Sequence, residues 1–136
     1  MRHEPNPLYT AKPYLTGLQE IDDEHEDLLI VVTDFARAVE SGAERSLVEK
    51  MISVAYNYAD YHFHHEEGIM RSLSYPFRID HEECHRRFLG AINKFQHEYS
   101  RGNDISEEIP YFLQAWVRDH IFGPDKELAL YLKYPS

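Results

Sequence analysis

The chain has 136 residues, of which 43% are hydrophobic, and a formal net charge of −10. This length predicts a single domain, and the negative charge argues against a nucleic-acid partner, whose phosphates would repel it. No apolar stretch approaches the roughly 20 residues of a membrane span, and the first residues lack the apolar segment of a signal peptide. Cys84 is the only cysteine, which excludes an internal disulfide and favours a cytoplasmic location.

Apolar residues recur at alternating steps of three and four, the pattern of amphipathic helices. The four expected helices cover residues 18–39, 47–69, 81–99 and 109–120. Gly42, Pro76 and Gly102 are expected to end the first three, and the fourth is expected to begin near Ser106. Residues 1–17 contain three prolines and predict an extended N-terminal arm. Short linkers join antiparallel neighbours, so the sequence predicts an all-α fold, an up-down-up-down four-helix bundle, over residues 18–136.

Polar residues interrupt these apolar patterns at positions that should face the core. They are His25, His62, Glu66, His81, His85, His120 and Asp125. The pairs His62/Glu66 and His81/His85 are four residues apart, so each pair shares one helix face. Two buried carboxylates require compensating positive charge, and no Lys or Arg occupies these inner positions. Five imidazoles and two carboxylates form a ligand set suited to two transition-metal ions.

The step from His120 to Asp125 is five residues, which does not fit an α-helix. Gly123 and Pro124 lie between them, and Pro124 cannot donate a hydrogen bond to the carbonyl of His120. A kink or an extra residue in the helix at this point would return Asp125 to the inner face.

Other polar residues near these positions are expected to play smaller parts. Glu67 lies one position off the inner face, and its replacement is expected to do little. The side chain of Cys84 is expected to point away from the His81/His85 face and to act in packing. The remaining histidines, His3, His64, His65 and His97, fit an ordinary role, with His65 the one placed to contact a ligand.

Five segments of the chain carry a family resemblance. They are GLQEIDDEH ending at His25, HFHHEE beginning at His62 and followed by Met70, Tyr75-Pro76, HEECH ending at His85, and WVRDHIFGPD ending at Asp125. Together they resemble the hemerythrin family, over about residues 17–132. The five-residue step from His120 to Asp125 is part of that family's pattern. One departure is the absence, from residues 10–16, of the Trp that bacterial members often carry before the glycine.

The resemblance implies two non-haem Fe ions per chain with an oxo or hydroxo bridge. His81, His85 and His120 would hold one iron, His25 and His62 would hold the other, and Glu66 and Asp125 would bridge them. Counting the solvent bridge, the first iron would have six ligands and the second five, which leaves the second an open position for O2. The residues expected to wall that pocket are Leu28, Trp116, Val117 and Ile121.

The expected function is therefore reversible O2 binding for storage, delivery or sensing, by a monomer that is not an enzyme. An oxygen-requiring enzyme is a candidate partner. An alternative is a di-iron oxidase, a peroxidase-like enzyme or an iron-oxidising enzyme, which would use paired ExxH motifs. Glu82 with His85 fits that motif and Asp22 with His25 echoes it, but the pairing leaves three histidines unused. A third reading is a regulatory module that senses iron, O2 or nitric oxide through a separate partner.

Overall fold

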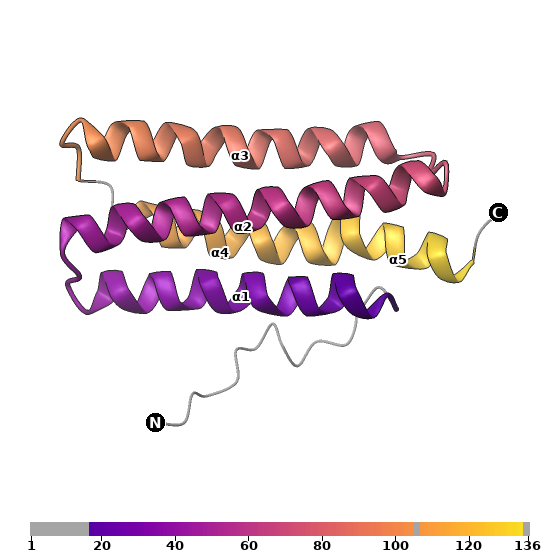
Figure 1. The fold of residues 1–136 in the computed structure, drawn as a ribbon, viewed down its shortest axis with the longest axis horizontal. Helices are drawn as coiled ribbons and strands as arrows, with labels where there is room; N and C mark the ends of the chain where they lie inside the picture. The colour runs from indigo at the N-terminus through magenta and orange to yellow at the C-terminus, as the bar shows by residue number, and fades with distance from the viewer. Residues whose placement is uncertain (1–16, 105–106, 135–136) are drawn as a thin grey trace, which may run out of the picture.

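The computed structural model describes residues 17–104 and 107–134, and its helices form a four-helix bundle (Figure 1). The elements are α1 (Gln19–Glu40), α2 (Arg45–Ser72), α3 (Arg78–Ser100), α4 (Glu108–His120), the π-helical turn η2 (Ile121–Asp125) and α5 (Lys126–Lys133). The last three follow one another without a break and together make the fourth rod of the bundle. The predicted all-α bundle is confirmed. Apart from Gly17, the expected arm lies outside the described residues.

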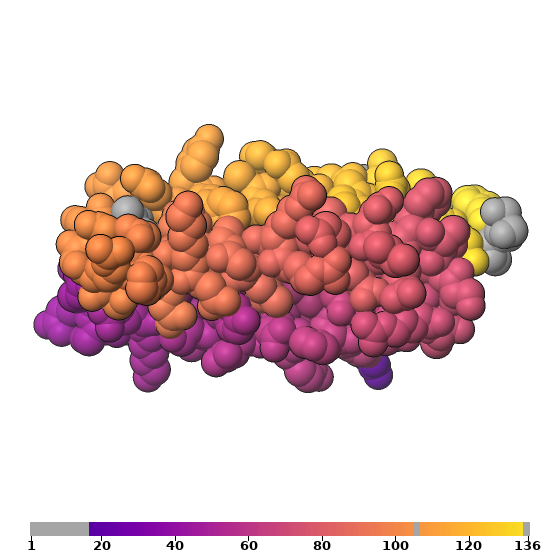
Figure 2. All heavy atoms as spheres, turned by 90° about the horizontal axis from the view of Figure 1, so that it is seen from above, coloured from indigo at the N-terminus to yellow at the C-terminus, as the bar shows by residue number. Residues whose placement is uncertain are grey.

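Each rod runs antiparallel to the one before it, which gives the predicted up-down-up-down order (Figure 1). In the view of Figure 2, α3 faces the viewer, α2 forms one edge of the molecule, and α4 with α5 forms the other edge. α1 and α3 are therefore diagonal to each other, with α2 and α4 between them. This arrangement turns one face of every helix toward a common axis.

The first three helices end in the same hydrogen-bonded turn. After α1, Gly42 donates to the carbonyl of Val39 and Ala43 donates to that of Ala38, each at 3.0 Å. Gly42 has a φ of 75°, which a glycine adopts without steric cost. Gly102 ends α3 in the same way, with a φ of 97°. Ser74 takes this position after α2, with a φ of 51°, just before the predicted break at Pro76. The expected start of the fourth helix at Ser106 lies outside the described residues.

The inner faces pack into two apolar clusters. The larger runs along the bundle and includes Phe35, Ile52, Phe63, Phe88 and Leu113. The smaller consists of Met70, Tyr75 and Leu128 near the end that carries η2 and α5. On α2 the polar positions His62 and Glu66 lie between Ala59 of the larger cluster and Met70 of the smaller one. None of the described helices is both long and apolar enough to cross a membrane.

Candidate metal centre

All seven polar residues of the inner positions meet inside the bundle, and each is at most 5% exposed. Their side chains form two groups, in each of which one atom per residue lies within 4.8 Å of the others. The three-histidine group contains His81, His85 and His120; the two-histidine group contains His25 and His62. Glu66 and Asp125 belong to both groups. Four rods therefore contribute to one site.

The π-helical turn brings Asp125 into this site. Residues Ile121–Asp125 form a turn in which hydrogen bonds span five residues instead of four, and Pro124 lies inside it. The wider turn absorbs the extra residue between His120 and Asp125, so Asp125 Oδ1 lies 3.1 Å from His120 Nε2. The predicted irregularity at Gly123-Pro124 is confirmed, and its form is a π turn.

The nitrogens of the three-histidine group converge. His120 Nε2 lies 3.1 Å from the Nε2 atoms of both His81 and His85. Two ligand nitrogens at right angles on one ion, each with a bond of about 2.1 Å, stand about 3.0 Å apart. The spacing of these three rings therefore fits one metal ion.

Both carboxylates divide their oxygens between the two groups. Glu66 Oε1 lies 2.7 Å from His81 Nε2, whereas Oε2 lies 3.6 Å from the Nε2 atoms of His25 and His62. Asp125 Oδ1 lies 3.0 Å from His81 Nε2, and Oδ2 lies 2.9 Å from His25 Nε2. Although these atoms are close, none of the four carboxylate oxygens has a partner aligned for a hydrogen bond. Buried oxygens without hydrogen bonds, each facing a cluster of nitrogens, have the arrangement of carboxylates that bridge two metal ions.

Among the described residues no Lys or Arg is buried. The negative charges of Glu66 and Asp125 are therefore offset by the histidines of the site itself. Burial favours the neutral form of every group, but attraction between the carboxylates and the imidazoles outweighs it. The surrounding histidines thus lower the pKa of Glu66 well below its usual range, and His120 and His25 lower that of Asp125. Against the effect of burial, Asp125 and Glu66 raise the pKa values of His25 and His81 to about 10.

These raised pKa values predict that metal ions compete with protons for the site. At pH 7 His25 and His81 hold protons that a metal ion must displace, because only the neutral ring binds metal. Metal affinity should therefore rise with pH, about tenfold per pH unit for each displaced proton. Calorimetric titration of Co2+ into the metal-free protein, in two buffers of different ionisation enthalpy, counts the protons released. We expect at least two per chain; a heat independent of the buffer would contradict this.

Two further carboxylates accept hydrogen bonds from the outer nitrogens of two site histidines. Glu24 Oε1 accepts a hydrogen bond from His62 Nδ1 at 2.8 Å, and Glu67 Oε2 accepts one from His85 Nδ1 at 2.7 Å. Because of this contact with His85, we expect the replacement of Glu67 to weaken metal binding, contrary to the expectation from its helix position. Its helix position is off the inner face, but its side chain reaches the far edge of the His85 ring on α3. The helical pattern predicts only which face of α2 a residue occupies. It therefore could not predict the hydrogen bond between Glu67 and the outer nitrogen of His85.

Aromatic rings cover the three-histidine group on its core side. Phe63 stacks on His85, with ring centres 3.9 Å apart, and Trp116 stacks on His120 at 4.3 Å. Phe63 was not singled out from the sequence; its position directly after His62 was the available signal. Leu28, Val117 and Ile121, three of the residues expected to wall the pocket, are buried in the adjoining core. Trp116, the fourth residue expected to wall the pocket, places its ring against His120, one turn further along α4.

The carboxylates of the alternative ExxH motifs lie outside the site. Glu82 accepts hydrogen bonds from Arg71 at 3.0 Å and Arg78 at 2.6 Å. Asp22 accepts one from the backbone of Gly17 at 3.2 Å. Both are thus held by other partners, and neither belongs to the two groups. Cys84, which is partly exposed, also lies outside them.

Comparisons with known proteins identify the family to which the chain belongs. The family model described as "Hemerythrin HHE cation binding domain" matches residues 16–132. A bacteriohemerythrin of Stenotrophomonas maltophilia is 28% identical over 83% of this chain and 73% of its own length. A myohemerythrin of Theromyzon tessulatum is 25% identical over 89% of this chain and 90% of its own. A crystal structure of wild-type hemerythrin superposes with a TM-score of 0.77 at 25% identity, covering 85% of this chain and 87% of that one. The chain belongs to the hemerythrin family.

Proposed function

We propose that this protein binds O2 reversibly at a centre of two non-haem iron ions. Membership of the hemerythrin family implies oxygen binding at non-haem iron. The observation that carries the proposal of two ions is the division of Glu66 and Asp125, each of which offers one oxygen to each histidine group. In this proposal His81, His85 and His120 hold one iron, His25 and His62 hold the other, and the two carboxylates bridge them.

Two ferrous ions held by these residues would supply the electrons that O2 takes up on binding and would recover them when O2 is released. The two-histidine group offers one nitrogen fewer, so that side of the centre is where we expect O2 to have access. Glu24 and Glu67 orient the rings of His62 and His85 by accepting hydrogen bonds from their outer nitrogens.

Reversibility depends on keeping water and protons away from the site. Leu28, Val117 and Ile121 are each at most 3% exposed and belong to the core that adjoins the centre. Met70, at 0% exposure, lies one turn beyond Glu66 and belongs to the smaller apolar cluster. We propose that these apolar side chains exclude solvent, so that O2 enters and leaves without permanent oxidation of the iron. Storage, delivery to an oxygen-requiring enzyme and sensing are all consistent uses of such a site.

The proposal is tested by loading the metal-free protein with ferrous iron without oxygen and then cycling it between O2 and vacuum. An absorption band that appears under O2 and disappears under vacuum over repeated cycles is the expected result. A single irreversible change on the first exposure to O2 would instead indicate an oxidase or an iron-oxidising enzyme.

A further inference from the structure

A carboxylate outside the proposed ligand set joins a site histidine to the protein surface. Glu24, on α1, is 8% exposed and lies between two imidazole rings of α2. Its Oε1 accepts a hydrogen bond from His62 Nδ1 at 2.8 Å, and its Oε2 accepts one from His65 Nδ1 at 2.6 Å. His62 and His65 are three residues apart on α2, so both rings reach the same carboxylate across the helix interface.

The two hydrogen bonds orient the His62 ring. His62 turns its Nε2 toward Glu66 Oε2, at 3.6 Å, and its Nδ1 toward Glu24. When a histidine binds metal through Nε2, its Nδ1 keeps a proton and needs an acceptor, and a carboxylate acceptor fixes both the ring orientation and the tautomer. Glu24 can hold His62 firmly only if its own side chain is held, and His65 supplies the second attachment.

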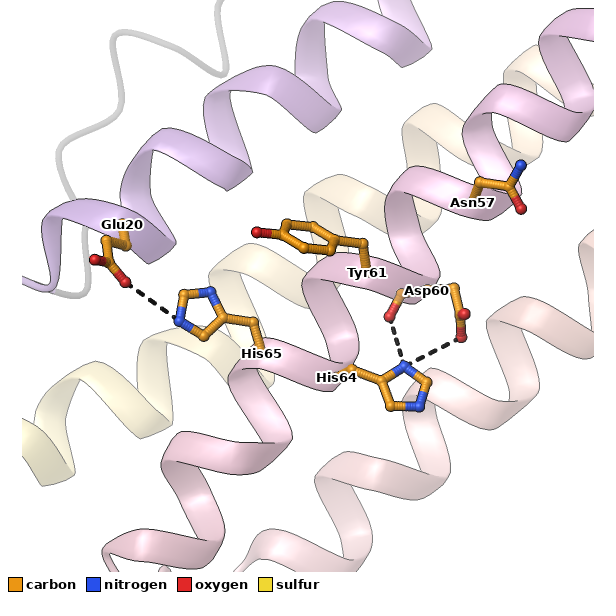
Figure 3. A pocket seen from close by; sticks show the side chains of 6 residues that line it. All are labelled: Glu20, Asn57, Asp60, Tyr61, His64 and His65. Carbon is orange, nitrogen blue, oxygen red and sulfur yellow. Dashed lines mark hydrogen bonds and ion pairs between the residues drawn. The ribbon is translucent and has the colours of Figure 1, made fainter.

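His65 also reaches the surface. Its side chain is 30% exposed and lines an open hollow with Glu20, Asn57, Asp60, Tyr61 and His64 (Figure 3). In that hollow its Nε2 lies 3.4 Å from Glu20 Oε2. The neighbouring His64 is 73% exposed and donates a hydrogen bond to the carbonyl oxygen of Asp60, on its own helix. Of these two adjacent histidines, only His65 is joined through Glu24 to a site histidine.

We infer that His65 is a positioning residue for the metal position that contains His25 and His62. It contacts no metal, but through Glu24 it sets the orientation of the His62 ring, and hence the affinity of that position. The inference rests on the proposed function, in that the two groups each hold one ion. It assigns a role at the centre to a surface histidine.

The test is a titration of the metal-free protein with Co2+, whose visible absorption reports each binding step. The parent should bind two ions, the weaker step belonging to the two-histidine group. Loss of a partner outside the ligand set costs roughly 10- to 100-fold in metal affinity. Glu24→Leu should weaken the weaker step by that amount. His65→Leu, one hydrogen bond further from the metal position, should weaken it by the lower end of that range, about 10-fold.

Three control variants separate positioning from general damage. His64→Leu removes the adjacent histidine of the same hollow and should leave both steps unchanged. His65→Gln, which retains a side-chain donor for Glu24, should restore most of the parent affinity and serves also if His65→Leu fails to fold. Glu67→Leu should weaken the tighter step instead. Parent-like binding in a folded His65→Leu, or equal loss in His64→Leu, would overturn the inference. A parent that binds only one Co2+ would instead overturn the proposed two-ion centre.

Discussion

Glu66→Ala is expected to lose most of its bound metal. Glu66 is 0% exposed, and its two oxygens face both histidine groups. In the proposed centre, its removal would take one ligand from each ion and leave Asp125 as the only ligand carboxylate to offset their positive charge. The fall in affinity should exceed the roughly 10- to 100-fold that loss of an outer partner costs. Iron bound per chain, measured after anaerobic loading and desalting, checks this.

Two matched variants define the cause of that loss. Glu26→Ala removes an exposed carboxylate next to His25 and should retain the parent metal content. Glu67→Ala should give an intermediate loss, because the hydrogen bond to His85 is removed while all the proposed ligands remain. If Glu66→Ala keeps two irons, the bridging role assigned to this carboxylate is wrong.

Leu28→Ala is expected to shorten the time over which the absorption band still appears under O2 and disappears under vacuum. Leu28 is 3% exposed and lies one turn after His25, so its truncation opens a cavity beside the two-histidine group. The cavity should cost about 2–5 kcal/mol of stability and should let water approach the site. The folded, iron-loaded variant should still respond to O2, but that response should decay to permanent oxidation faster than in the parent over repeated cycles.

Leu113→Ala is the control for the loss of stability. Leu113 is 1% exposed and lies two turns before His120 on α4, so the same atoms are removed from the core at a greater distance from the site. It should lower the thermal midpoint about as much as Leu28→Ala while leaving the O2 response at parent lifetime. Equal lifetimes in the parent and in Leu28→Ala would make Leu28 an ordinary core residue.

Much of the fold followed from the sequence because apolar spacing determines which face of each helix is buried. The ends of α1 and α3 were predicted from Gly42 and Gly102, where a positive φ favours glycine. The break in phase between His120 and Asp125 predicted an irregular helix. It did not specify a π turn, because a kink would restore the same face.

The side-chain contacts made between different helices could not be predicted from the sequence. Glu67 was placed by its helix position, but its contact depends on how far α3 lies from α2 and which edge of His85 faces it. The Glu24 bridge between His62 and His65 likewise requires the packing of α1 against α2. The stacking of Trp116 on His120 depends on side-chain rotamers, which spacing does not specify.

The most direct test of the account is the number of iron ions bound per chain. Metal-free protein is loaded with ferrous iron under anaerobic conditions, weakly bound iron is removed, and iron and protein are quantified on the same sample. If Glu66 and Asp125 each join two histidine groups around two ions, the ratio is two irons per chain. A ratio of one, or tight zinc binding with no iron chromophore, would contradict the two-ion centre.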